Sequence, residues 1–368
     1  MKKMILLVAA LFVFTIPARL SAQLKGTWMS EMREKDHEIQ LTLRYRDNWN
    51  SSFGIDPKEF TGLTTKGLAG ATVEQTFTLE REAGTITFEG KFVDGDGSGH
   101  FTFVKNEQYA GQLSSLGFGD ADIEDQFSLA LHGVSIDYIR QMKSLGFKSL
   151  TLDDIISMSI HDVTPDYVKA LASEGYSHLA PDDLVSMMIH DVSLEFVREL
   201  RTLGYSHVTP DDLVSLCIHG ATIPYLRELK QLGYGHISAD DVVNMLIHDV
   251  STDFIRSLDT LGYHAVSPDD LVSMMIHGVD EEYLHALDAL GYGGQTPDDL
   301  VSMKIHSVTP EYIRGLKGYG LNNVSPDDLV SMNIHGVTLS WIKELKDRGY
   351  NRLTPERLVD MRIHGTDD

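Results

Sequence analysis

From Asn106 to the C-terminus, the hydrophobic and polar positions recur in a block of 29 residues without insertion or deletion. In the copy that spans residues 180–208, Phe196, Val197, Leu200 and Leu203 follow the i, i+1, i+4, i+7 spacing of a helix. A fixed period between 20 and 50 residues is typical of a solenoid, in which each unit buries its apolar face against its neighbours.

The first helix of each block has clear start and stop signals. Eight of nine copies place a capping residue type in the column of Thr209, six place Pro in the next column, and two acidic residues follow. After the helix, the column of Asp191 holds Gly, Asp or Ser, and an apolar residue follows in eight of nine copies, which is the pattern of a Schellman-type stop. In the copy above, these signals predict a helix over Pro181–Ile189.

A second helix begins directly after this stop. Its capping column holds Ser, Thr, Asp or Asn in all nine copies, and its stop column is glycine from Gly117 to Gly349. Helices this short are marginal alone, so packing between repeats must supply most of their stability. The pattern of residues 106–368 therefore predicts an α-solenoid of about eight helix-turn-helix repeats.

Residues 23–105 change to alternation of apolar and polar positions, as at Ile39, Leu41, Leu43 and Tyr45. Such alternation between Gly and Asp turns predicts five or six antiparallel strands joined as a meander into a small β barrel or sandwich. The runs cover residues 27–32, 38–45, 72–80, 84–92 and 100–104. The alternation is less regular over residues 55–70, which indicates a long loop or a short helix. The fold class is thus α+β and multidomain.

Residues 1–22 have the pattern of a secretory signal peptide, with Lys2 and Lys3 before a 13-residue apolar run, Met4–Ile16. That run is too short to span a bilayer comfortably, so we expect export to the periplasm or the medium without stable membrane insertion. Cys217 is the only cysteine, so no intramolecular disulfide can form. The repeats carry 18 basic and 41 acidic residues, which argues against nucleic acid as a partner.

One histidine per repeat closes the first helix. Neighbouring copies should lie about 10 Å apart, whereas zinc ligands lie about 2 Å from one ion, so a helix-ending role is expected rather than a metal site. The repeated acidic pairs are explained as helix caps. Asp94–Gly99 imitates the start of an EF-hand loop, but Lys105 occupies the position of the required Glu, which favours a Gly-rich hairpin turn. The histidines are His132, His161, His190, His219, His248, His277, His306, His335 and His364.

No nucleophile elbow, P-loop, HExxH or dinucleotide fingerprint occurs, so neither an enzyme nor a cofactor is expected. In an array, fixed columns hold packing and recognition falls on exposed columns that vary. The column before each Ile-His pair varies from apolar to polar, which predicts either a partner-binding stripe or simple core filling. This predicted binding column contains Met188, Cys217, Leu246, Met275, Lys304 and Asn333.

The repeat pattern GY-x-x-L-x-P-D-D-L-V-x-M-x-I-H-G-V-x-x-x-Y-I-R-x-L resembles a family of secreted or envelope bacterial proteins. The β segment, through Gly26–Trp28 and Gly84–Phe103, is similar to modules beside such repeats, some of which are attached to beta-lactam-sensor-type membrane metallopeptidases. The resemblance implies an envelope role with a sensing partner. This chain lacks the peptidase motif and the transmembrane helices of the fused forms.

Together these features predict a non-enzymatic exported scaffold that binds a protein partner on its solenoid. The alternative is a β module that binds a small molecule or glycan, with Trp28 and Trp49 among the lining residues and the solenoid as a spacer.

Overall fold

The computed structural model describes residues 23–33, 38–46, 49–64, 68–69, 71–205 and 208–365. The predicted signal peptide, residues 1–22, lies outside the described residues. The chain divides into two compact units, one formed by residues 1–169 and 177–182 and the other by residues 170–176 and 183–368. Each unit is described by itself below.

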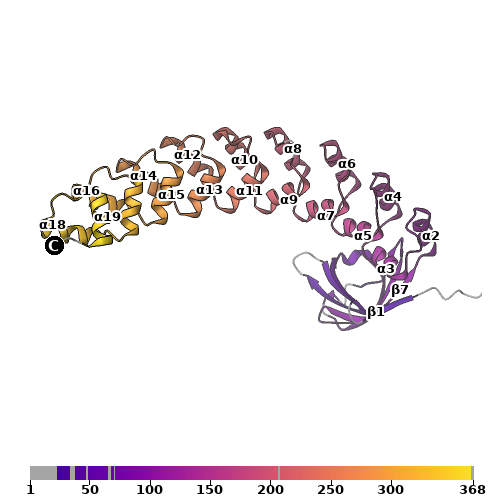
Figure 1. Ribbon diagram of the computed structural model, residues 1–368. Coiled ribbons are helices and arrows are strands. Elements are labelled where there is room, and N and C mark those ends of the chain that lie inside the picture. The colour runs from indigo at the N-terminus through magenta and orange to yellow at the C-terminus, as the bar shows by residue number, and fades with distance from the viewer. Residues whose placement is uncertain are drawn as a thin grey trace, which may run out of the picture. The chain divides into compact units, whose positions relative to one another are not determined.

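The first unit contains a single curled antiparallel sheet, a half-barrel, with strand order β3-β2-β1-β7-β6-β5-β4 (Figure 1). Its strands are β1 (Gln23–Arg33), β2 (Glu38–Tyr45), β3 (Trp49–Ile55), β4 (Phe60–Thr61), β5 (Val73–Arg81), β6 (Gly84–Val93) and β7 (Asp96–Lys105). The predicted antiparallel β module is confirmed, but the two edge strands were not predicted. Because β1 pairs with both β2 and β7, two meanders join at the first strand.

The predicted hairpin turn at Asp94–Gly99 is also confirmed. Val93 pairs with Asp96, and the two residues between them, Asp94 and Gly95, have φ angles of 52° and 96°. Two successive positive φ angles are typical of the tight turn that matches the twist of a β-hairpin. Farther along β7, a Cβ atom at Gly97 would lie only 2.6 Å from the Trp28 ring, so this glycine makes room for the tryptophan.

Aromatic side chains fill the inner face of the sheet. Trp28 is 1% exposed and makes edge-to-face contacts with Phe77 and Phe88, at centroid distances of 5.3 and 6.1 Å. Helix α3 (Ile123–Leu131) packs on strands β1, β5, β6 and β7. Its Phe127 stacks on Phe101 of β7 at 5.3 Å. The first repeat therefore closes the inner face of the half-barrel.

The helical region alternates between two kinds of short helix. The odd-numbered ones are α3, α5 (Leu152–Ile160), α7 (Pro181–Ile189), α9 (Pro210–Ile218), α11 (Ala239–Ile247), α13 (Pro268–Ile276), α15 (Pro297–Ile305), α17 (Pro326–Ile334) and α19 (Pro355–His364). The even-numbered ones are α2 (Glu107–Ser115), α4 (Ile136–Ser144), α6 (Pro165–Ser173), α8 (Leu194–Leu203), α10 (Ile223–Leu229), α12 (Thr252–Thr260), α14 (Glu281–Ala289), α16 (Pro310–Gly318) and α18 (Leu339–Asp347). The predicted solenoid, and the bounds predicted for α7, are confirmed.

Within the second unit the helices form two layers (Figure 1). Helices α9, α11, α13, α15, α17 and α19 pack side by side in one layer, and α8, α10, α12, α14, α16 and α18 pack in the other. No described helix has the length and apolar character needed to cross a membrane.

Buried and half-buried tyrosine hydroxyls join successive repeats in two registers. In the first, Tyr283 of α14 donates to the carbonyl of Val308, 25 residues later, at 2.8 Å. In the second, Tyr234 at the end of a repeat donates to the carbonyl of Val266, 32 residues later, at 2.7 Å. The same pairs recur at Tyr109–Val134, Tyr138–Val163, Tyr225–Val250 and Tyr312–Val337, and at Tyr176–Val208 and Tyr292–Val324. These bonds fix the register of each repeat on the next.

Candidate functional site

The local structure of each odd-numbered helix determines which side chains it exposes, and α11 is representative. Ser238 and Asp241 form a reciprocal capping box in which each backbone N–H donates to the other residue's side chain at 3.0 Å. The helix ends at His248, Asp249 adopts a left-handed φ of 56°, and Val250 N–H donates to the Met245 carbonyl at 2.9 Å. These bonds complete the predicted Schellman stop.

The buried stripe of α11 contains Val242 and Met245, which are both 0% exposed. Ile247 lies two positions after Met245, about 200° farther around the helix, and therefore points away from this stripe. It is 50% exposed. The same geometry recurs in every odd-numbered helix of the second unit. The resulting isoleucine row contains Ile189, Ile218, Ile247, Ile276, Ile305, Ile334 and Ile363, each 50–57% exposed.

A second row lies on the same side of these helices, at their N-terminal ends. Asp240 precedes Ile247 by seven residues, which places it on the same face about 10 Å away along the axis. Among the described residues these carboxylates form no ion pair. This acidic row contains Asp211, Asp240, Asp269, Asp298 and Asp327, all exposed.

The predicted binding column lies beside the isoleucine row and is half-buried at all six positions. Two polar members contact the preceding repeat: Asn333 Nδ2 donates to the His306 carbonyl at 3.0 Å, and Lys304 Nζ lies 4.2 Å from the centroid of the Tyr283 ring. Burial raises the pKa of the Cys217 thiol, which favours its unreactive protonated form. This column thus lies at the junction between repeats.

The histidines of the ladder end their helices, as the sequence predicts. His335 illustrates the predicted ring contact, since its Nδ1 atom lies 2.8 Å from the Ser331 carbonyl. His132 differs because the desolvation of its half-buried ring lowers its pKa. Within the described part of the chain, no three His, Cys, Asp or Glu side chains gather closely enough to hold a metal ion.

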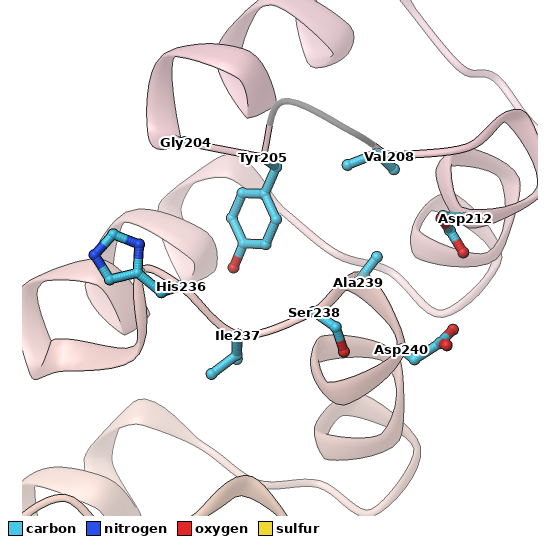
Figure 2. A pocket seen from close by; sticks show the side chains of 10 residues that line it. Gly204, Tyr205, Val208, Asp212, His236, Ile237, Ser238, Ala239 and Asp240 are labelled. Carbon is cyan, nitrogen blue, oxygen red and sulfur yellow. The ribbon is translucent and has the colours of Figure 1, made fainter.

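A cleft of about 320 Å³ lies between the links that precede α9 and α11 (Figure 2). Tyr205 is 9% exposed, and its ring points toward the backbone of Ile237 and Ser238. Tyr234 occupies the equivalent position one repeat later and bonds to Val266, but the Tyr205 hydroxyl has no hydrogen-bond partner among the described residues. Tyr205 thus lacks one of the bonds between repeats.

The β module offers little space on its inner face. The indole Nε1 of Trp28 donates to the Glu89 carbonyl at 3.3 Å, and the ring is enclosed by aromatic neighbours. The side chain of Trp49, the other predicted lining residue, lies outside the described residues. A shallow groove of about 710 Å³ does occur on the outer face, where Met29, Gln40 and Thr42 contribute to its lining.

Comparison of the chain with protein-family models and with curated proteins gives no match. The candidate site therefore rests on its geometry alone. The isoleucine row was not identified from the sequence, because an apolar column without variation was interpreted as packing. The available signal was the helical phase: within α11, Ile247 falls outside the stripe that Val242 and Met245 define.

Proposed function

We propose that this protein is an exported, non-enzymatic scaffold whose helical array binds a protein partner through the isoleucine row. The observation that carries the proposal is the repetition of a half-exposed isoleucine at one position of seven successive helices. Single exposed apolar residues are common, but an aligned row of them is typical of an interaction surface.

The packing between repeats supports a rigid surface. The tyrosine bonds and the side-by-side contacts of α9, α11 and α13 hold neighbouring isoleucines in a fixed register. A rigid surface loses little conformational entropy when a partner binds. The alternative of a ligand site inside the β module has less support, because Trp28 and its aromatic neighbours fill that face.

The test is crosslinking with mass spectrometry in the native envelope, with the double variant Ile218→Asn/Ile247→Asn. We expect discrete crosslinked proteins for the wild type and their loss in the double variant, with the melting temperature retained. The control, Glu195→Ala/Gln231→Ala, changes one exposed residue on α8 and one just after α10, away from the isoleucine row, and should retain the crosslinks.

Two results would reject the proposal. One is an unchanged set of crosslinks in the isoleucine variant. The other is turnover of an envelope substrate that a point substitution abolishes without unfolding the protein.

A further inference from the structure

The charges around the isoleucine row are of one sign from α9 to α13. Each of these three helices contains two aspartates and no Lys or Arg. The first aspartate belongs to the exposed acidic row, whereas the second, such as Asp212, lies in a capping box or bonds to the capping residue.

From α8 to α13, every Lys and Arg lies on or directly after an even-numbered helix. Arg227 lies 2.7 Å from Glu199, and Arg256 lies 2.7 Å from Glu228, each pair joining two repeats. Their positive charges are therefore engaged on the other helix layer. On α9, α11 and α13, the acidic row has no Lys or Arg on its own helices.

The spacing between successive isoleucines of the row restricts the shape of a ligand. Helices packed side by side are about 8–10 Å apart, so successive isoleucines of the row recur at about that interval. An α-helix repeats every seven residues at about 10.5 Å, which closely matches it. The predicted binding column adds a second, half-buried apolar group to each of these repeats, namely Cys217, Leu246 and Met275. From Lys304 onward the residues of this column are polar. Met188 and Ile189 continue the pattern on α7, but that helix is divided between the two units, so the apolar strip is defined here on α9, α11 and α13.

We propose that this strip binds a cationic amphipathic α-helix of a partner protein, which runs along α9–α13 with apolar residues on the isoleucine row and Lys or Arg toward the acidic row. This inference rests on the proposed function and adds the chemistry of the partner. Helix-in-groove recognition uses apolar anchors at heptad spacing in the same way.

Charge favours a basic helix over two other possible occupants of the strip, a second copy of the chain and a membrane surface. In a second copy of the chain, whose formal net charge is −23, the isoleucine row would bring a second acidic row to the interface, and like charges there oppose association. An anionic membrane surface is repelled for the same reason. A basic helix is instead attracted by the acidic row.

The test uses synthetic peptides of about three heptads, or about 30 Å as helices, titrated against the mature chain by fluorescence anisotropy. A Lys/Leu heptad peptide should bind and become helical by circular dichroism. A Glu/Leu peptide and a Lys/Ser peptide should not bind. Binding of the Glu/Leu peptide with similar affinity would overturn the cationic assignment.

Two sets of variants test the rows separately. Ile218→Asn/Ile247→Asn should weaken Lys/Leu binding by about thirtyfold, or ~2 kcal/mol, for two half-exposed isoleucines. The matched pair Ile334→Asn/Ile363→Asn lies beyond the apolar strip and should change binding by less than about threefold. Equal losses in the two pairs would reject the placement on α9–α13.

Replacing Asp211, Asp240 and Asp269 by Asn should weaken binding by about tenfold and reduce its dependence on salt. If the isoleucine variants matter but the Asp→Asn variant does not, the cationic assignment fails and the proposed function survives. If neither set matters, the isoleucine row is not a binding surface and both fail. A wild-type dimer, or binding to phosphatidylcholine vesicles, that the isoleucine substitutions abolish would instead identify a second copy or a lipid surface and overturn the proposal.

Discussion

Two tyrosines in equivalent positions of adjacent repeats should respond to the same substitution with different effects on stability. The Tyr234 hydroxyl donates to the Val266 carbonyl at 2.7 Å, and the residue is 7% exposed. Tyr234→Phe removes the donor and leaves a carbonyl without its partner, which should lower the free energy of unfolding by about 1–2 kcal/mol. Tyr205 is 9% exposed, but its hydroxyl has no partner among the described residues.

Tyr205→Phe therefore removes a buried polar group that makes no bond. We expect the free energy of unfolding to stay unchanged or to rise by up to about 1 kcal/mol. The measurement is urea unfolding followed by circular dichroism at 222 nm, with the slopes of the transitions compared to confirm that the same structure unfolds. A loss of stability in Tyr205→Phe as large as that in Tyr234→Phe would refute the reasoning, because it would show that the hydrogen bond is not the source of the difference.

Three further predictions concern single positions and pH. Ile247→Ser should cost less than about 1 kcal/mol in thermal unfolding because the side chain is half-exposed, whereas Met245→Ser in the same helix should cost several kcal/mol; similar losses would contradict the exposure of the row. Ser307→Gly should raise the melting temperature, because it relieves about 1 kcal/mol of backbone strain at a φ of 58°. A lower melting temperature in this variant would show that the serine side chain makes a stabilising contact. Burial raises the pKa of four tyrosines to about 12, so the folded state retains protons that the unfolded state releases near pH 10. The free energy of unfolding should therefore fall as the pH rises from 10 to 12, and urea midpoints that stay constant over this range would exclude the effect. These tyrosines are Tyr138, Tyr225, Tyr283 and Tyr312.

Much of the helical fold could be predicted from the sequence because its signals are local. Capping residues, acidic first turns and positions for a left-handed backbone define where α7 begins and ends. The tyrosine bonds could not be predicted in this way, since they depend on the register between repeats. Tyr205 and Tyr234 each follow the glycine that ends a second helix, so the sequence pattern does not distinguish them.

The strands show the same division between local and tertiary signals. Strand β2 alternates clearly and was predicted with the observed bounds, whereas β3 has the run Asn50-Ser51-Ser52, which lacks an apolar alternation. Strand β3 forms because it pairs with β2 along its whole length. The closure of the sheet by Phe127 also needed the fold, because that residue lies in a repeat and contacts strands distant in sequence.

The constant spacing of the tyrosine bonds has a genetic consequence. Every bond joins residues 25 or 32 positions apart, so each links a repeat to the one that follows it. Loss or duplication of whole 29-residue segments inside the array would recreate the same bonds at the new junction. An insertion whose length is not a multiple of 29 would shift the register and break the bonds that span it. The number of repeats can therefore change by unequal recombination without a change of fold. Each added copy would extend the surface by one isoleucine.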